Sequence, residues 1–211
     1  MTDFADLLTG YQRFRGTDWR RQHERWAELR EGQSPKVMVI ACSDSRVDPA
    51  QIFDTSPGEI FVVRNIANLV PPFENDGSRH GVSAALEFAV RVLEVQEIVV
   101  MGHGACGGVQ AALSQSFRGL PPGEGGFIGH WVDMLDDARE RVVAAHGDGP
   151  EAIRALELET VRVSIRNLRT FPCIPEHEAS GRLTLHGAYF AIADGVLHVM
   201  DENGNFGEAR A

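Results

Sequence analysis

The sequence predicts a doubly wound α/β fold. Three short apolar runs, at 37–41, 59–63 and 97–101, have the length and composition of strands that are buried on both faces of a parallel sheet. Segments with helical periodicity alternate with these runs, and such alternation is typical of a sheet covered by helices on both sides. We therefore expect a mostly parallel β-sheet flanked by helices.

The other elements follow without a clear domain boundary. Apolar residues at helical spacing predict two helices within 3–31, the second capped by Thr17 or Asp18, and the loop at 119–126 is too short for a domain linker. Two late strands are expected at 182–192 and 196–200, with an Asp-Gly turn between them. The remaining predicted helices span residues 79–94, 105–115, 127–146 and 150–169.

Composition limits the function classes. The 211 residues suffice for one sizeable core and are few for two. The formal net charge of −10 offers no basic surface for nucleic acid or an anionic membrane. The first residues lack the pattern of a secretory signal, and no apolar run reaches the roughly 20 residues of a membrane helix. We expect a cytoplasmic protein that binds neither nucleic acid nor membrane.

Three cysteines in a chain expected to be cytoplasmic favour metal binding or catalysis over a disulfide framework. Cys42 follows the first predicted strand, and His103 and Cys106 follow the third at H-x-x-C spacing. In an open α/β sheet, sites form outside the carboxyl ends of the strands, so these side chains can converge. Three such ligands leave one open position on a tetrahedral zinc ion, as in catalytic zinc sites. Cys173 lies outside both motifs and is expected to be a packing residue.

Two motifs now point to a family. The residues ACSDSRV at 41–47 and GHGACGG at 102–108 resemble the two signatures of the β-carbonic anhydrases. The likeness covers nearly the whole chain, through PGEIFVVRNIANLVPP at 57–72 and NLRTFP at 167–172, and is greatest to the plant-type branch.

The resemblance implies a Rossmann-like sheet with an amino-terminal helical arm, in a single domain over residues 1–211. The arm is expected at 1–31 and the α/β core at 35–211. Whether the arm covers its own core or packs on a partner subunit stays open. One zinc ion per chain, carbon dioxide and bicarbonate as ligands, and a homodimer or higher homo-oligomer are also implied. The implied activity is the reversible hydration of carbon dioxide, that of a carbonate dehydratase.

Asp44 and Arg46 lie within four residues of Cys42 and are expected to be catalytic. A guanidinium grips a carboxylate with two parallel hydrogen bonds and keeps it ionised. An ionised Asp44 can accept a hydrogen bond from water or hydroxide and aim an oxygen lone pair at carbon dioxide. The resemblance implies the same role for this pair.

The resemblance also supplies the expected substrate-binding residues, which are Gln33, Phe61, Ile66, Phe88 and Gly107. Gln33 would offer a side-chain amide from the neighbouring subunit. The three apolar residues would line the pocket for carbon dioxide, although the sequence alone suits them equally to core packing. Glycine permits close approach, so the N–H of Gly107 can point at bicarbonate.

Some members of the family hold regulatory bicarbonate with a Trp, an Arg and a Tyr, and in them Asp can take the fourth position on zinc. This chain has Val39, Arg64 and Phe190 at the matching places. It lacks the indole N–H and the phenol that would hold the anion. We expect an open fourth position and no such regulatory site.

Three alternatives stay open at this point. The same site can act on a related heterocumulene such as carbon disulfide, and pocket access decides between the two substrates. A structural zinc protein without catalysis is a second alternative, although Asp44 and Arg46 argue against it. Gly102, Gly104 and Gly107 also match G-x-G-x-x-G spacing after a strand, but His and Cys within that motif suit a metal better than a pyrophosphate.

Overall fold

The computed structural model describes residues 2–210, which divide into two compact units, one up to Ser34 and one from Pro35 onward. The first unit holds three helices where two were expected within 3–31: α1 (Phe4–Gly16), α2 (Asp18–Arg21) and α3 (His23–Leu29). Asp3 caps α1 through a capping box with Asp6. The helical character of this segment is therefore confirmed, with breaks at Thr17 and Gln22.

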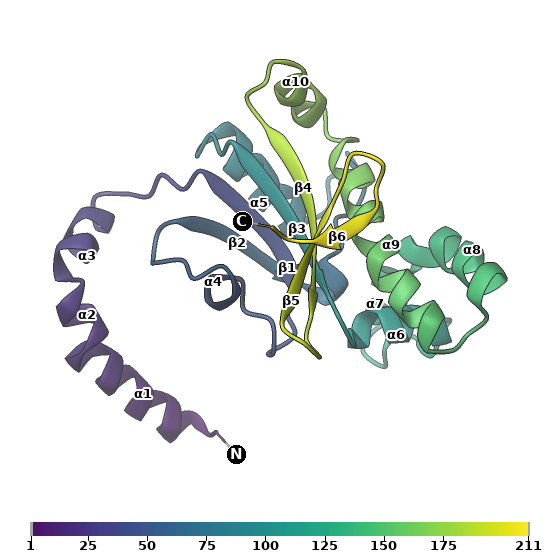
Figure 1. The fold of residues 1–211 in the computed structure, drawn as a ribbon, viewed down its shortest axis with the longest axis horizontal. Helices are drawn as coiled ribbons and strands as arrows, with labels where there is room; N and C mark the ends of the chain where they lie inside the picture. Colours follow the sequence, from purple (N-terminus) through teal and green to yellow (C-terminus); the bar gives the residue numbers. More distant parts are fainter. Residues whose placement is uncertain (1, 211) are drawn as a thin grey trace. The chain divides into compact units, whose positions relative to one another are not determined.

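The second unit is built on one sheet, whose strands within the described residues run in the order β2-β1-β3-β4-β5-β6 (Figure 1). The first four of these pair in parallel, and the last two pairings are antiparallel. The strands are β1 (Val37–Cys42), β2 (Ile60–Asn65), β3 (Glu97–His103), β4 (Thr184–Ala191), β5 (Val196–Met200) and β6 (Phe206–Glu208). The predicted mostly parallel α/β sheet is confirmed.

The central strand β1 is buried on both faces, as its uninterrupted apolar run predicts. Met38 and Ile40 on one face join a core that includes Leu86 of helix α5 (Gly81–Arg91) and Val161 of helix α9 (Pro150–Leu168). Val39 and its neighbours on the other face form a separate cluster. The alternation follows from the two-residue period of a strand.

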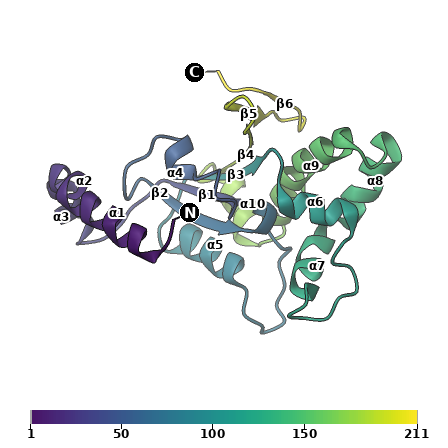
Figure 2. The ribbon, with the colours of Figure 1, turned by 90° about the horizontal axis from the view of Figure 1, so that it is seen from below.

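The other helices of this unit are α4 (Pro49–Ile52), α6 (Gly107–Ser114), α7 (Gly126–Val132), α8 (Asp136–His146) and α10 (Cys173–Ala179), with 3-10 turns η1 (Ile66–Asn68) and η2 (Asp133–Leu135). Helices α6 to α9 lie together at one end of this unit (Figure 2). The helix expected over 127–146 is divided at η2 into α7 and α8. Elements α4, η1, α10 and β6 are absent from the sequence-based expectation.

The sheet order places a topological switch point at its carboxyl edge. From β1 the chain passes to β2 on one side and later to β3 on the other side, so the strand order reverses between β1 and β3. Ligand sites of open α/β sheets lie outside the strand ends at such a reversal. The residues that end β1 and β3 are Cys42 and His103.

Candidate metal centre

Three buried side chains meet at this edge of the sheet. Cys42 ends β1, His103 ends β3, and Cys106 caps the amino terminus of α6. Cys42 is 5% exposed, and His103 and Cys106 are each 1% exposed. Their ligand atoms all lie within 4.8 Å of one another. The fold therefore gathers the three predicted ligands, which lie as far as 64 positions apart in the chain.

The spacing of these atoms fits a zinc ion. Cys42 Sγ lies 3.9 Å from Cys106 Sγ. Two thiolates bound to a tetrahedral zinc at about 2.3 Å lie about 3.8 Å apart. A disulfide would need about 2.0 Å, and both cysteines are free. Two sulfurs and one imidazole are also a donor set that zinc prefers.

The imidazole of His103 is prepared as a ligand. Its Nδ1 lies 2.9 Å from the carbonyl oxygen of Gly104. A carbonyl only accepts, so Nδ1 carries the proton and Nε2 presents a lone pair. Nε2 is buried and has no hydrogen-bond partner among the described residues. A buried acceptor is normally satisfied, and a metal ion would satisfy this one.

The two thiols are electrostatically coupled. Hydrogen bonding with Cys106 lowers the pKa of Cys42 well below its usual range despite its burial, and the N–H groups of Asp44 and Ala67 lower it further. The contact with Cys42, together with burial, raises the pKa of Cys106. The pair therefore holds a proton that a bound dication displaces, since metal-ligating cysteines are thiolates.

Asp44 and Arg46 form the predicted bidentate pair beside these ligands. Arg46 Nε donates to Asp44 Oδ1 at 2.9 Å, and Nη2 donates to Oδ2 at 2.7 Å. Nη2 also donates to the carbonyl of Ala105 at 3.0 Å, which links the Cys42 loop to the His103–Cys106 turn. The hydrogen bonds from Arg46 hold the pKa of Asp44 well below its usual range. Asp44 is thus an ionised acceptor next to the metal ligands.

Arg64 of β2 fastens the loop that carries Cys42 and Asp44. Its Nε donates to the Cys42 carbonyl at 2.9 Å, and its Nη2 donates to the Asp44 carbonyl at 2.6 Å. The same guanidinium reaches the Val47 carbonyl and the Asp48 carboxylate. This positioning role is absent from the sequence-based expectation, where Arg64 is considered only as an anion ligand. The sequence signal for this role is that Arg64 is a charged residue near the end of an otherwise apolar strand.

The structure places two of the expected substrate-binding residues at the ligand turn and the other three elsewhere. Gly107 begins α6 directly after Cys106, and nothing lies within 4 Å of the place a Cβ would take there. Ile66 is 43% exposed and contacts Gly108 beside the ligand turn. Phe61 and Phe88 stack on each other with ring centroids 6.0 Å apart. Phe61 precedes the end of β2 by four residues, or about 13 Å along the strand. Gln33 belongs to the amino-terminal unit.

Gly108 gives a prediction about stability. A Cβ there would lie 2.6 Å from Ile66 Cγ2 and 3.0 Å from Ala67 Cβ. We expect Gly108→Ala to lower the free energy of unfolding by about 1–3 kcal/mol, because overpacking displaces the η1 turn. Gly107→Ala is the matched control and is expected to leave stability unchanged or slightly raised. Equal stability of both variants in urea denaturation would contradict this account.

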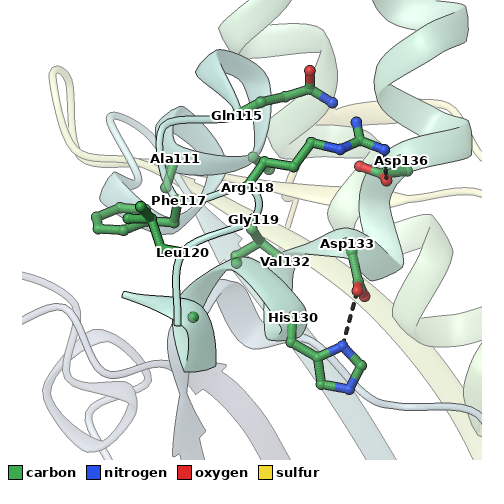
Figure 3. A pocket seen from close by; sticks show the side chains of 13 residues that line it. Ala111, Gln115, Phe117, Arg118, Gly119, Leu120, His130, Val132, Asp133 and Asp136 are labelled. Carbon is green, nitrogen blue, oxygen red and sulfur yellow. Dashed lines mark hydrogen bonds and ion pairs between the residues drawn. The ribbon is translucent and has the colours of Figure 1, made fainter. Parts of the chain in front are cut away.

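A separate pocket of about 290 Å³ lies between α6 and α7 and contains none of the predicted site residues (Figure 3). Its charged groups are paired: Arg118 lies 3.5 Å from Asp136, and His130 lies 3.0 Å from Asp133. Paired groups of this kind leave little charge to recognise a ligand. We therefore take the Cys42–His103–Cys106 group, rather than this pocket, as the candidate site.

Comparisons with known proteins agree with this geometry. Residues 37–197 match the family described as carbonic anhydrase. The chloroplastic beta carbonic anhydrase 5 of Arabidopsis thaliana is 36% identical over 193 residues, which cover 90% of this chain and 62% of that protein. The chain thus spans less than two thirds of that relative's length.

Solved structures give the same result across the full fold. The β-carbonic anhydrase CcaA superposes with a TM-score of 0.88 at 30% identity, over 97% of this chain and 91% of that one. Two tetrameric β-carbonic anhydrases from Sordaria macrospora were also solved, and the match to their structure has a TM-score of 0.77 at 30% identity, over 99% and 97% of the chains. The matched fold, together with the cysteine and histidine ligands at the ends of β1 and β3, leads to one assignment. This chain belongs to the β-carbonic anhydrase family.

Proposed function

We propose that this protein catalyses the reversible hydration of carbon dioxide to bicarbonate and a proton, with one zinc ion per chain. The observation that carries the proposal is the buried Cys42–His103–Cys106 group, with an ionised Asp44 beside it. Zinc in such a site supplies the Lewis acidity that makes hydroxide available from water near neutral pH. The side chains around the ligands are proposed to orient the attacking oxygen and to bind the substrate.

Asp44 and Arg46 are the proposed catalytic residues. The Asp44 carboxylate accepts a hydrogen bond from the attacking oxygen and directs its lone pair at the carbon of the substrate. Arg46 keeps this carboxylate ionised and fixed, because its fork occupies both oxygens. Arg64 holds the backbone on either side, so the loop needs little rearrangement before reaction.

Five residues are proposed to bind the substrate. The N–H of Gly107 and the side-chain amide of Gln33 would orient oxygen atoms of carbon dioxide or bicarbonate. Ile66, Phe61 and Phe88 would supply apolar surface for a substrate that has no charge. The position of Ile66 and Gly107 beside the ligand turn supports their part. Gln33 and the two phenylalanines depend on assembly with a second chain.

Isotope exchange tests this function. Labelled bicarbonate should lose ¹⁸O to water faster in the presence of the protein, in proportion to its zinc content. The exchange requires both directions of the reaction, so a structural zinc protein would not accelerate it. Hydrolysis of carbon disulfide without any such exchange would favour the heterocumulene alternative.

We also propose that the protein is a homodimer or a higher homo-oligomer. Strand β2 is an edge of the sheet, and exposed edges are normally covered. Exposed apolar side chains lie on β2, on η1, on α5 and directly after α5, namely Val62, Ile66, Phe88 and Val92. Helix α1 likewise exposes Phe4, Leu7, Leu8, Tyr11 and Phe14, and none of its residues is buried. A second copy of the chain would cover both surfaces, and the tetrameric relatives support this assembly.

Light scattering tests the assembly. Val92 is 62% exposed, and we expect Val92→Lys to weaken association at least about tenfold, since a charge in an apolar interface is costly. Val199 is 41% exposed on β5, which lies toward the other end of the strand order from β2. Val199→Lys is therefore the matched control. A wild type that is active and stable as a monomer would refute the assembly.

The chain is also proposed to act as a single domain over residues 1–211, a proposal supported by solved structures that match 97% and 99% of the chain. A cytoplasmic location is proposed from the three free cysteines, which suit a reducing compartment. No described helix has the length and apolar character to cross a membrane. Cell fractionation of the tagged protein tests the location.

A further inference from the structure

A buried carboxylate lies behind the metal-ligand turn and takes no part in the proposed reaction. Glu157 is in the middle of α9 and is 3% exposed. A carboxylate at such a position is costly unless each oxygen is hydrogen-bonded. Its two oxygens have separate partners from distant parts of the chain, which indicates a specific role.

The first partner is the metal-ligand turn itself. Glu157 Oε1 accepts the backbone N–H of Cys106 at 3.2 Å. Cys106 is the residue that caps α6, so its N–H is near the positive end of the helix dipole, where a carboxylate is favourable. The hydrogen bond fixes the backbone nitrogen of Cys106, which is bonded to the Cα from which the ligand sulfur projects.

The second partner fixes the carboxylate. The Tyr189 hydroxyl on β4 donates to Glu157 Oε2 at 2.7 Å. Burial and the hydrogen bond to Glu157 raise the pKa of Tyr189, so this phenol remains a donor. The Arg154 guanidinium lies 3.6 Å from the centre of the Tyr189 ring, a cation–π contact that helps to hold the ring.

The turn between His103 and Cys106 depends on contacts with side chains from other elements. Between the two ligands, Ala105 has a φ of 54°, in the left-handed region that costs energy for a residue with a Cβ. A Cβ at Gly104 would lie 3.0 Å from the Tyr189 hydroxyl, so that hydroxyl packs directly on the turn. A strained turn persists only where its surroundings enforce it.

We propose that Glu157, held by Tyr189, is a positioning residue that fixes Cys106 for metal binding. The inference rests on the proposed zinc centre and assigns no contact with the substrate. Residues in contact with metal ligands commonly contribute about tenfold to a hundredfold in metal affinity. Zinc affinity in the absence of substrate is therefore the quantity that this role predicts.

The test measures zinc dissociation constants by competition with a chromogenic chelator. Glu157→Met removes both acceptors at similar volume, and we expect zinc affinity to fall about tenfold to a hundredfold. Glu157→Gln keeps an acceptor for the Cys106 N–H and should restore affinity to within about threefold of wild type. Glu159→Met, on the same helix but paired with Arg162, is the matched control and should retain wild-type affinity.

A spectroscopic readout separates positioning from general destabilisation. With cobalt(II) in place of zinc, Glu157→Met should alter the thiolate-to-cobalt charge-transfer band, and Glu157→Gln should preserve it. Wild-type zinc affinity and an unchanged band in Glu157→Met would overturn the proposal, even if thermal unfolding occurred earlier. If Glu157→Met does not fold, Tyr189→Phe decides, since a loss of zinc affinity supports the role and no loss refutes it. A wild type that binds zinc but does not hydrate carbon dioxide would refute only the proposed function.

Discussion

Cys106→Ser is expected to abolish tight zinc binding and to lower kcat/KM by about a thousandfold or more, given the size of enzymatic rate accelerations. Cys106 is 1% exposed, and its sulfur lies 3.9 Å from that of Cys42. A serine hydroxyl fills nearly the same space but is a poor ligand for zinc, which prefers thiolate and imidazole. The apparent stability should also fall, because zinc binds the folded chain and not an unfolded one.

The matched control for this variant is Cys173→Ser. Cys173 is also buried, at 7% exposure, but it lies in the core cluster with Ile174 and Leu183, apart from the ligands. We expect this variant to keep one zinc ion per chain and wild-type kcat/KM, with a modest loss of stability. Zinc content by elemental mass spectrometry and hydration by stopped flow measure both outcomes. Full zinc loading and full activity in Cys106→Ser would contradict the ligand assignment.

Asp44→Asn is expected to retain zinc and to lower kcat/KM by about a hundredfold to ten-thousandfold, the range for a positioned proton-transfer or hydrogen-bonding group. The amide is neutral, so it loses the attraction of Arg46 and presents an NH₂ group to one of the two donors of that fork. The orientation of the attacking oxygen is lost with the ionised acceptor. The three metal ligands are unchanged, which is why zinc should remain.

Asp54→Asn is the control for the loss of one negative charge. Asp54 is exposed beyond α4, and its φ of 49° is one that Asn also tolerates. We expect this variant to match the wild type in zinc content and in kcat/KM. An Asp44→Asn variant as active as Asp54→Asn would remove the proposed catalytic role of Asp44.

The parts of the fold that the sequence predicts well are those with a local pattern. The apolar runs at 37–41 and 97–101 become β1 and β3 because strands buried on both faces need apolar residues at every position. Cys42 and His103 were predictable as neighbours because parallel strands end at the same edge. By contrast, the short helices α4 and α10 and the strand β6 depend on tertiary contacts more than on propensity.

Arg64 and Glu157 show what a local pattern cannot reveal. The role of each residue appears only when segments that are distant in the sequence come together. Glu157 is buried because α9 packs on the ligand turn and β4, and on the sequence nothing distinguishes it from Glu151 and Glu159 of the same helix. Arg64 points to backbone carbonyls, which carry no sequence signal. The ligands were predictable, but the residues that hold them in place were not.

The most direct test of the central claim is stopped-flow hydration of carbon dioxide by the wild-type protein, with zinc quantified in the same preparation. We expect one zinc ion per chain and a hydration rate that rises in proportion to bound zinc, from about pH 6 to about pH 9. A chelator that removes the metal should abolish the rate, and added zinc should restore it. A fully zinc-loaded protein that does not accelerate hydration anywhere in that range would contradict the account.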